Sequence, residues 1–308
     1  MTLPVRLSVI VVTWNAKHYV EQCLASLQQL SETPPEIIVV DNASSDGTPE
    51  LIREHFPQVH LIRSDENCGF ARGNNIGIQH SHGDYIALVN SDVIVPAGCF
   101  DKILAYMDCN SDVGLLGPQM VGPDGSIRRS TMRNPTLWNL LCRALALDRL
   151  FQRTRWAGGF LMRDFPHDRT QDVEVLNGWF WVARRQALKD VGPLDGQFFM
   201  YGEDLDWCYR FQKEGWRLVF FAGARAIHFG GGSSAAAPLR FHREEYQANL
   251  KYWRKHHGRA STAAYAAVAI LHEMMRIAGH SMVALARPRS REESTFKVLR
   301  SANIFRWL

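Results

Sequence analysis

Two short runs, Leu7-Ser-Val-Ile-Val-Val12 and Ile37-Ile-Val-Val40, decide the fold of this chain. Both are rich in β-branched residues and have the length of a buried strand. Apolar residues at helical spacing from Val20 to Leu27 lie between them. The chain therefore begins as strand, helix, strand.

The same alternation continues along the next fifty residues. Pro49 starts a second helix, Val59–Arg63 is a third strand, Gly73–His80 is a helix, and Tyr85–Val89 is a fourth strand. Such alternation predicts an α/β fold with a mostly parallel, Rossmann-like sheet and helices on both faces. Ligands of these sheets bind outside the carboxyl ends of the strands.

Length, composition and charge limit the class of protein. The chain has 308 residues, 46% of them apolar, so we expect one large domain or one domain with a helical appendix. The net charge of +4 is too balanced to make nucleic acid the main partner. The first apolar run is too short for a secretory signal, and we therefore expect a cytoplasmic protein.

The six cysteines form no Cys-x-x-Cys pair and no dense framework. Their spacing indicates neither a zinc site nor structural disulfides. Reduced thiols in the cytosol fit this pattern best.

Polar residues follow the predicted strands at their carboxyl ends. Asp41 directly follows the second strand, Asp46 lies in the turn after it, and Asn90-Ser91-Asp92 follows the fourth. A loop aspartate is often a turn former or a cap, a role that suits Asp46 as well as a functional one does. Asp41 and Asp92 come straight after buried strands, where a plain turn needs no charge, so we expect them in a ligand site.

The segment Asn67–Asn75 combines glycines and amide side chains with one guanidinium, that of Arg72. Flexible backbone with an arginine suits a nucleotide or a phosphate, and a helix-entry loop is the alternative. The segment matches neither G-x-G-x-x-G nor a P-loop, so dinucleotide and kinase chemistry are not supported.

A cluster of acids opens a predicted helix in the stretch Phe198-Phe-Met-Tyr-Gly-Glu-Asp-Leu-Asp-Trp-Cys-Tyr-Arg210. Glu203, Asp204 and Asp206 fall in its first turn, after an aromatic run and Gly202. A helix N-terminus stabilises carboxylates in the ionised form, so a capping cluster is the simplest interpretation. Three acids after an aromatic run and a glycine weaken that interpretation, and the rest of the chain has to decide.

Two further segments carry aromatic or basic residues. An apolar helix predicted from Leu137 to Phe151 is surrounded by arginines; we favour an ordinary packed helix over a surface for an amphiphilic partner. Val173–Ala183 reads as a strand in which Trp179 and Trp181 alternate, and these rings either face a sugar or, more commonly, pack in the core. The arginines in and beside the helix predicted over 137–151 are Arg143, Arg149, Arg153 and Arg155.

The C-terminal part is predicted to be helical from Phe241 to His257 and from Ala263 to Ala286. The second segment is strongly apolar but carries polar residues, which argues against a transmembrane span. Basic runs precede and follow it. An in-plane helix on an anionic membrane surface and a helix that forms a homodimer are the two alternatives.

The ordered set of motifs resembles family 2 inverting glycosyltransferases with the GT-A fold, and most of all the rhamnosyltransferase-type members. It consists of Asp41 after the second strand, Asn90-Ser91-Asp92 after the fourth, Gly202-Glu203-Asp204 at a helix start, and His228 before a glycine loop. The resemblance covers roughly residues 6–232. It implies a glycosyltransferase domain over 1–240, with a nucleotide-binding part (1–120) and an acceptor-binding part (121–240), and a helical extension over 241–308.

Matched position by position, the resemblance implies two binding regions. Thr13 and Asp41 contact the base or ribose, and Arg72 and Asn75 line the nucleotide-sugar pocket. The further residues expected to bind the nucleotide-sugar are Asn15, Asn42, Asp46, Asn90 and Ser91. The residues expected to bind the acceptor are Asn177, Gly178, Trp179 and Trp181.

The resemblance also implies a divalent metal, Mn²⁺ or Mg²⁺. Asn90-Ser91-Asp92 occupies the family's Asp-x-Asp site, with Asn90 in place of the first acid, so Asp92 is the expected ligand. His228 matches a histidine that completes the metal site in many relatives. Carboxylate and imidazole ligands with diphosphate oxygens suit such ions.

The expected reaction is inverting transfer of a sugar, rhamnose or another hexose, from a dTDP-, UDP- or GDP-linked donor. The expected acceptor is a glycan or a polyprenyl-linked glycan in cell-surface polysaccharide synthesis. Asp204 is the expected base and Glu203 its neighbour at the acceptor. The alternatives are a catalytically silent nucleotide- or glycan-binding module and a sugar nucleotidyltransferase. We expect a cytoplasmic protein at the inner face of the cell membrane.

Overall fold

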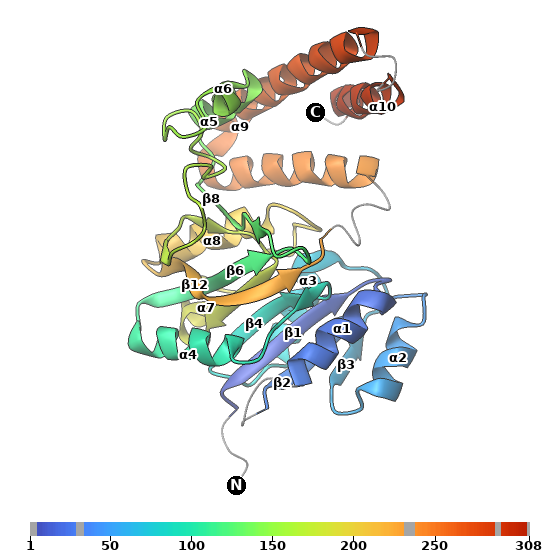
Figure 1. Cartoon of the computed structure of the whole chain (residues 1–308), viewed down its shortest axis with the longest axis vertical. Helices are drawn as coiled ribbons and strands as arrows, with labels where there is room; N and C mark the ends of the chain where they lie inside the picture. The colour runs from blue at the N-terminus through green and yellow to red at the C-terminus, as the bar shows by residue number, and fades with distance from the viewer. Residues whose placement is uncertain (1–4, 29–33, 231–237, 287–290, 307–308) are drawn as a thin grey trace. The chain divides into compact units, whose positions relative to one another are not determined.

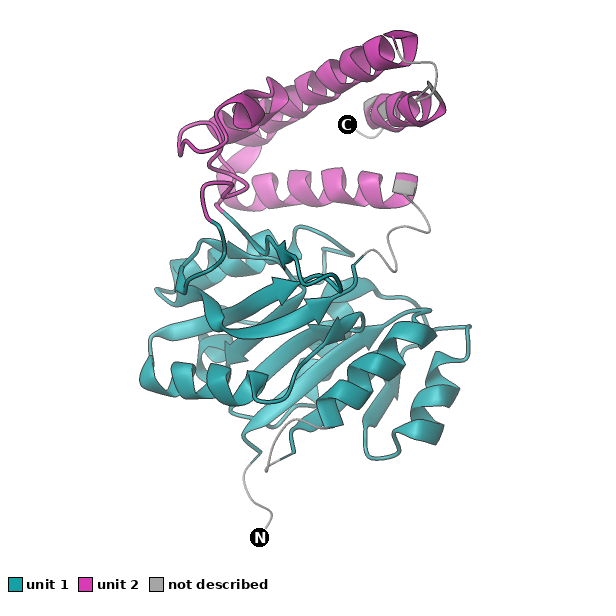
Figure 2. Ribbon diagram, viewed as in Figure 1, with its two compact units in different colours: residues 1–132, 166–236 teal, residues 133–165, 237–308 magenta. Residues whose placement is uncertain are grey.

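The computed structural model describes residues 5–28, 34–230, 238–286 and 291–306. The chain divides into two compact units (Figure 2). Unit 1 comprises residues 1–132 and 166–236, and unit 2 comprises residues 133–165 and 237–308. Residues 133–165 thus group with the C-terminal helices. In the division expected from the sequence they belong to the acceptor-binding part, residues 121–240.

Unit 1 is built on a mixed sheet whose strands follow the order β3-β2-β1-β4-β11-β6-β12-β5. β1, β2, β3 and β4 pair in parallel, and β12 is parallel to β6. β11 runs antiparallel to both β4 and β6, so β6 and β12 point the same way as β4. The longer strands are β1 (Leu7–Thr13), β2 (Glu36–Asp41), β3 (His60–Arg63), β4 (Tyr85–Asn90), β6 (Val113–Val121), β11 (Phe180–Arg184) and β12 (Arg217–His228).

Short strands extend this sheet and form a second, two-stranded one. β5 and β9 pair antiparallel with β12, β7 pairs with β6, and β8 pairs with β10 apart from the main sheet. They are β5 (Val93–Ile94), β7 (Ile127–Arg128), β8 (Thr131–Met132), β9 (Gln171–Asp172) and β10 (Val175–Leu176).

Helices cover both faces of the main sheet (Figure 1). Those of unit 1 are α1 (Lys17–Gln28), α2 (Thr48–His55), α3 (Gly69–Gln79), α4 (Cys99–Cys109), α7 (Arg185–Val191) and α8 (Glu203–Lys213). Alternate residues of β1 divide between the faces: Val9 and Val11 join the core cluster that includes α1 and α4. Val12 faces α3, where a Cβ on Gly73 would lie 2.9 Å from a Val12 methyl, so glycine lets α3 pack close to the sheet.

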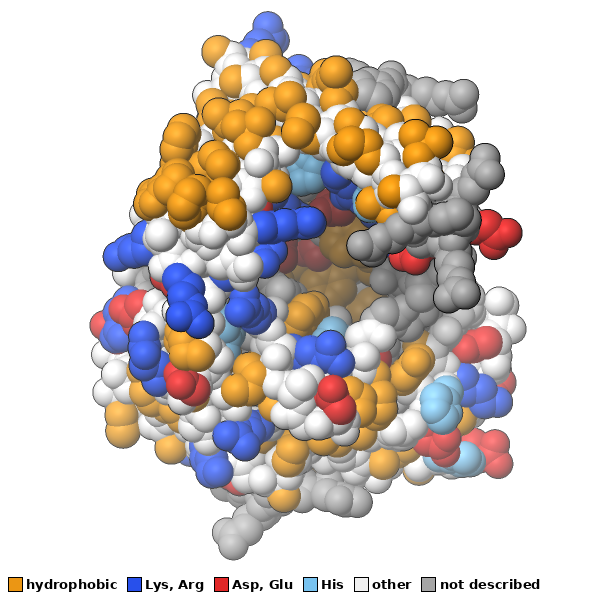
Figure 3. All heavy atoms as spheres, turned by 45° about the horizontal axis from the view of Figure 1, so that its top comes forward, with side chains coloured by type: hydrophobic (Ala, Val, Ile, Leu, Met, Phe, Trp, Pro, Cys, Tyr) orange, Lys and Arg blue, Asp and Glu red, His pale blue; other side chains and the backbone are white. Residues whose placement is uncertain are grey.

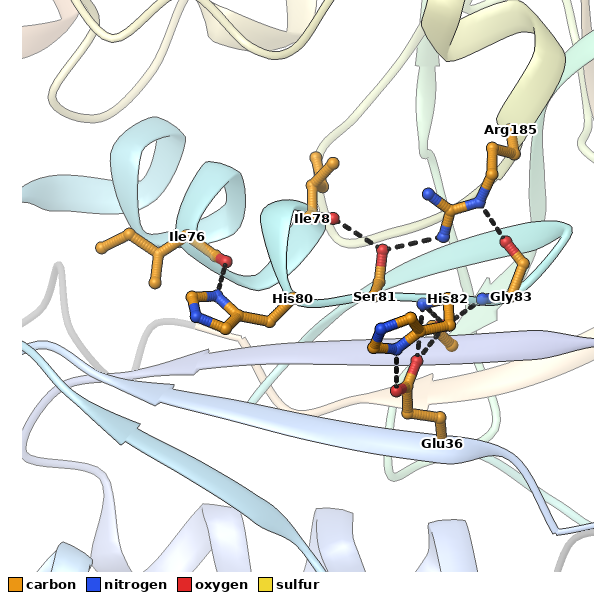
Figure 4. A network of polar contacts seen from close by, with 9 residues as sticks. Glu36, Ile76, Ile78, His80, Ser81, His82, Gly83 and Arg185 are labelled. Carbon is orange, nitrogen blue, oxygen red and sulfur yellow. Dashed lines mark hydrogen bonds and ion pairs between the residues drawn. The ribbon is translucent and has the colours of Figure 1, made fainter. Parts of the chain in front are cut away.

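The opposite end of the sheet from the strand carboxyl ends is held by a polar network (Figure 4). The Glu36 carboxylate accepts hydrogen bonds from the Ser8 hydroxyl and from the backbone N–H of His82 (2.5 and 2.9 Å). Its other oxygen lies 2.8 Å from His82 Nδ1, and the Arg185 guanidinium donates to the Ser81 hydroxyl (3.0 Å). Because Ser8, Glu36 and His82 come from β1, β2 and the loop before β4, the network fixes the starts of three neighbouring strands, and Arg185 at the start of α7 joins it through Ser81.

Unit 2 is helical, with α5 (Leu137–Ala144), α6 (Leu147–Leu150), α9 (Pro238–Ala286), α10 (Arg291–Ala302) and a 3-10 helix (Asn303–Arg306). α9 is two helices joined at Gly258, whose φ of 78° is not helical. The Trp253 and Tyr265 rings stack across that joint with centroids 5.6 Å apart. In the part of the chain that the structure describes, no helix combines the length and the apolar character needed to cross a membrane.

Several sequence predictions of elements need correction. The helix expected over 137–151 is broken, because Ala146 adopts a left-handed conformation with φ of 57° between α5 and α6. The strand expected over 173–183 is interrupted by a turn, so that only β10 and β11 are extended. The apolar runs at residues 216–221 and 226–228 read as two separate strands in the sequence, but the structure joins them in one strand, β12, which bulges between Phe221 and Arg225.

Candidate active site

One edge of the main sheet gathers most of the predicted site residues. β1, β2, β4 and β12 all end there, at Thr13, Asp41, Asn90 and His228. β11 starts at the same edge because it is antiparallel to β4, so Trp179 also lies there. The backbone N–H of Asn90 donates to the Trp179 carbonyl (3.1 Å), which ties the two segments together.

Thr13 and Asp41 lie side by side at the ends of β1 and β2 and are both buried. The Thr13 hydroxyl and Asp41 Oδ1 have no hydrogen-bond partner. The second Asp41 oxygen accepts from the Ser44 N–H (3.2 Å) and lies 3.8 Å from the Arg63 guanidinium. Buried polar atoms without partners are costly, so two of them side by side indicate a place where a ligand makes the missing bonds.

The loop after β2 is held by its own side chains. Asn15, in a left-handed conformation (φ 48°), accepts from the Ser45 N–H, and Asn42 donates to the Gly69 carbonyl. Asp46 accepts from the backbone N–H groups of Lys17 and Thr48 and from the Thr48 hydroxyl. Burial alone would raise the pKa of Asp46, but these hydrogen bonds outweigh it and lower the pKa. The Asp46 carboxylate is thus engaged in shaping the loop, the role that the sequence left open.

Arg72 and Asn75 on α3 bond to the loop that leads to α8. The Arg72 guanidinium donates to the Gly196 carbonyl (3.0 Å). The Asn75 amide donates to the Leu194 carbonyl and accepts from the Leu194 N–H (2.7 and 3.0 Å). Both side chains therefore position this loop, and any contact with a nucleotide-sugar would come in addition.

Asp92 and His228, the two predicted metal ligands, lie together although they come from distant parts of the chain. Asp92 Oδ1 is 3.3 Å from His228 Nε2, and both side chains are nearly buried, with 14% and 10% exposed. The Phe229 N–H donates to the Asp92 carbonyl, and the Trp179 ring packs on the imidazole with centroids 4.7 Å apart. Ser91 and Asp92 occupy the turn between β4 and β5.

The acidic motif begins α8 at an unusual backbone turn. Tyr201 and Gly202 both have positive φ (68° and 76°), so the chain reverses sharply just before Glu203. Phe199, two residues before Tyr201, accepts a hydrogen bond from the Phe70 N–H through its carbonyl, and a side chain on Gly69 would collide with that carbonyl. Since Asn42 bonds to the same Gly69, the start of α8 is linked to the end of β2.

The three acids of α8 differ in environment. Glu203 is buried, its Oε2 has no hydrogen-bond partner, and burial together with the neighbouring Asp204 carboxylate raises its pKa well above the usual value. Asp204 is partly exposed and accepts from the Leu205 N–H (2.8 Å). Asp206 is fully buried and forms an ion pair with Arg210 (2.9 Å), as a structural residue would.

The residues expected to bind the acceptor fall into two groups. Asn177 Oδ1 is buried without a hydrogen-bond partner, and the adjacent Gly178 and Trp179 lie at the same edge as Asp92. Trp181 is different, because its ring is fully buried, packs against Trp207 and donates to the Leu176 carbonyl. The expectation that Trp181 contacts the acceptor is therefore corrected: a ring with no exposed surface can only support the start of α8.

Residues 8–192 match the family described as glycosyl transferase family 2. This chain belongs to glycosyltransferase family 2. The family predicted from the motifs is thus confirmed. An N-acetylglucosaminyl-diphospho-decaprenol L-rhamnosyltransferase of Mycobacterium tuberculosis is 30% identical over 244 residues, which cover 75% of this chain and 78% of the relative. A low-salt glycan biosynthesis hexosyltransferase of Haloferax volcanii is 21% identical, over 72% of this chain and 66% of the relative.

Solved structures confirm the fold of this family 2 member. A mannosyltransferase of Pyrobaculum calidifontis, in complex with GDP-Man and Mn²⁺, superposes with a TM-score of 0.58 at 16% identity, over 98% of this chain and 87% of that chain. GalNAc-T7 with UDP, GalNAc and Mn²⁺ gives a TM-score of 0.56 at 14% identity, over 82% and 51%. The GT-A fold predicted from the sequence is therefore present.

Sequence reasoning missed two residues beside the site. Arg63 ends β3, directly beside Asp41 in the strand register, and its guanidinium is the cation nearest to that carboxylate among the ion pairs of the described residues. Cys68 donates its thiol hydrogen to the Asn42 side chain. The position of Arg63 at the end of a predicted strand was a usable signal, because neighbouring parallel strands end side by side.

Proposed function

We propose that this family 2 glycosyltransferase transfers a sugar, rhamnose or another hexose, with inversion from a nucleotide diphosphate donor to a glycan or polyprenyl-linked acceptor in cell-surface polysaccharide synthesis. The observation that carries this proposal is the meeting of three groups at one edge of the sheet. They are the partnerless oxygens of Thr13 and Asp41, the Asp92–His228 pair, and the start of α8, which is tied to the end of β2 through Asn42, Gly69 and Phe199.

Donor binding is assigned to the ends of β1 and β2. A base or ribose that donates a hydrogen to Asp41 Oδ1 and bonds to the Thr13 hydroxyl would satisfy both buried oxygens at once. Arg63 and Arg72 supply cations on the same side of unit 1 for phosphate oxygens. Bases of dTDP, UDP and GDP all offer suitable donors, so these three donor classes are the ones to test.

A divalent metal, Mn²⁺ or Mg²⁺, fits the Asp92–His228 pair by the chemistry of its ligands. A carboxylate oxygen and an imidazole nitrogen 3.3 Å apart suit a shared cation, and oxygen ligands of a diphosphate would complete the set. The described residues contain no group of three His, Cys, Asp or Glu side chains placed to hold a metal alone, so binding would depend on the donor. A bound ion would stabilise the negative charge of the leaving nucleoside diphosphate.

The base is assigned to Asp204. Burial and the neighbouring Asp204 carboxylate raise the pKa of Glu203 well above its usual value, which favours the protonated form, so Glu203 is better suited than Asp204 to donate a hydrogen bond. Asp204 is reached by solvent and can take the proton of an incoming acceptor hydroxyl. One displacement with one base inverts the anomeric centre, and we assign the orientation of the acceptor to Asn177, Gly178 and Trp179.

The lipid-linked acceptor class is supported by the mycobacterial relative, which by its name acts on a decaprenol-linked diphosphate. An enzyme with such an acceptor works where polyprenyl lipids are, so we assign this chain to the inner face of the cell membrane as a cytoplasmic, peripheral protein. The alternative role of the C-terminal helices, formation of a homodimer, is tested separately below.

Incubation of the purified protein with dTDP-rhamnose and with UDP- and GDP-hexoses, a polyprenyl diphosphate–linked N-acetylglucosamine acceptor, and Mn²⁺ or EDTA tests this function. We expect one donor class to give a glycosylated lipid with inverted anomeric configuration by NMR, and EDTA to abolish it. Asp204→Asn should reduce transfer at least about 1,000-fold. Near-normal transfer by Asp204→Asn would show that the base is elsewhere, and retention of configuration would overturn the mechanism.

A further inference from the structure

In the last part of α9, residues 261–286, the exposed residues are all apolar. Within residues 261–286, every residue classed as exposed is alanine, valine, leucine or methionine. Met282 and Leu285 are 66% and 85% exposed, values that leave most of each side chain in water. The exposed residues are Ala263, Ala267, Met274, Met275, Ala278, Met282, Val283, Leu285 and Ala286.

Three polar residues of the same segment, His272, Glu273 and Arg276, are buried or partly buried within unit 2. Glu273 is fully buried and accepts a hydrogen bond from the Tyr246 hydroxyl, and the Arg276 guanidinium lies 3.6 Å from the same carboxylate. Burial of His272, with the nearby Arg143, lowers its pKa to about 4, so the ring is neutral. A helix on the surface of a water-soluble domain shows the reverse arrangement, with its apolar side inward and its polar side in water.

A second exposed apolar group lies on the α5–α6 segment and is bordered by arginines. Trp138, Phe151 and Trp156 form a ring cluster with centroid distances of 6.5 and 5.1 Å, and Leu150 beside them is 73% exposed. The exposed charged residues between 145 and 156 are Arg149, Arg153 and Arg155, and the acid of this segment, Asp148, is buried. Figure 3 shows hydrophobic side chains gathered over the helices of unit 2, with Lys and Arg side chains beside them.

Both exposed apolar groups belong to unit 2. Among the described residues, the exposed large hydrophobic side chains lie in unit 2, with the exception of Ile127. Isolated exposed hydrophobic residues are normal on any protein, but a concentration on one unit marks an interaction surface. We call the exposed apolar residues of 261–286 together with Trp138, Leu150, Phe151 and Trp156 the apolar face.

We propose that the apolar face docks into the interfacial region of an anionic lipid bilayer. Methionine and leucine side chains of α9 would enter the acyl boundary, and the tryptophans would lie at the level of the head groups, where their amphipathic rings are favoured. Arg149, Arg153 and Arg155 would pair with lipid phosphates. The inference deepens the proposed function and rests on it in one respect: a lipid-linked acceptor is the reason for an enzyme to stay on a membrane.

The charge of the α5–α6 segment favours a bilayer over a second copy of the chain. In a two-fold dimer the same surface meets itself, so both copies of the α5–α6 segment would bring three exposed arginines, and no exposed acid, into one interface. Like charges brought together in an interface from which water is excluded are destabilising. An anionic membrane supplies the opposite charge along the whole face.

Sedimentation of the full chain with sucrose-loaded vesicles tests this inference. Vesicles of phosphatidylcholine alone and with about 30% phosphatidylglycerol are compared at low and high salt. For Met274→Gln/Met275→Gln/Met282→Gln we expect at least about a tenfold loss of binding to anionic vesicles, because glutamine keeps the helix but not the apolar surface. For Arg149→Gln/Arg153→Gln/Arg155→Gln we expect loss of the preference for anionic lipid. Ile127→Gln, in unit 1, is the matched control and should bind as the wild type does.

Each variant is first checked for native circular dichroism and for donor turnover with a water-soluble acceptor, both of which should be unchanged. Wild-type-like vesicle binding by the methionine variant would overturn the inference. A second result would also overturn it: the wild-type protein does not bind vesicles, light scattering shows it to be a dimer, and the methionine variant is a monomer. Vesicle binding without turnover of any nucleotide-sugar would instead support docking of the apolar face on a membrane and contradict the proposed function.

Discussion

Asp92 and His228 approach within 3.3 Å at the carboxyl edge of the sheet, and the ring of Trp179 covers the imidazole. We predict that Asp92→Asn and His228→Ala each reduce sugar transfer at least about 100-fold, because each removes one of two expected ligands. Both should also weaken Mn²⁺-dependent binding of the nucleotide-sugar in calorimetry. His60→Ala, at the opposite end of the sheet, is the control. Full Mn²⁺-dependent binding by His228→Ala would exclude the pair as the metal site.

The partnerless hydroxyl of Thr13 predicts opposite effects on stability and on binding. Thr13→Val removes a buried polar atom without breaking a bond, so the free protein should gain about 1 kcal/mol in unfolding free energy. The same variant should bind the donor about tenfold more weakly. Thr48→Val is the matched control, because that hydroxyl donates to Asp46 and its removal should destabilise the protein. A destabilised Thr13→Val protein would mean that the hydroxyl has a partner within the protein.

The raised pKa of Glu203 predicts a pH-dependent stability. A carboxyl whose pKa is higher in the folded state stabilises the fold at low pH, and this contribution is lost as pH rises through the folded pKa. Glu203→Gln mimics the protonated acid, so its melting temperature should exceed that of the wild type by an amount that grows with pH. Glu214→Gln, exposed at the other end of α8, should show no such trend. A constant difference across pH would contradict a raised pKa of Glu203.

Glu36 predicts the opposite pH dependence. Burial works to raise its pKa, but hydrogen bonds from Ser8 and His82 outweigh it and lower the pKa. Its stabilising contribution is present above the unfolded pKa and is lost as pH falls through the folded pKa. Glu36→Gln should therefore cost about 1.5–3 kcal/mol at neutral pH, measured by urea unfolding, and much less in acid. Glu54→Gln is the control. An equal loss at all pH values would show that the charge of Glu36 is not what the network needs.

Much of unit 1 could be predicted because its strands are local signals. The apolar runs that begin at Leu7, Ile37 and Tyr85 each predict a buried strand, and parallel pairing places their polar ends together. The antiparallel insertion of β11 between β4 and β6 could not be predicted, since it depends on pairing between residues far apart in the chain. The break between α5 and α6 at Ala146 could not be predicted either, because no glycine or proline lies at that position.

The candidate site was predictable in position more than in detail. Residue type and place at a strand end brought Asp92 and His228 to one edge, as they lie in the structure. The sequence does not show which polar atoms are already used: Asn75 has its amide bonded to Leu194, and Trp181 has its ring enclosed in the core. Such internal bonding depends on the packing of loops from different parts of the chain.

The helical unit is assembled from two stretches of chain, 133–165 and 237–308. A premature stop before residue 237 would not remove this unit cleanly, because α5 and α6 are encoded upstream and would remain without the helices they pack against. The truncated chain would expose Cys142 and Ala144, which are buried in the full chain, beside the exposed ring cluster of Trp138, Phe151 and Trp156. Truncated transcripts or trimmed expression clones of this gene should therefore yield insoluble protein, and a soluble core would need an internal deletion as well as a shortened tail.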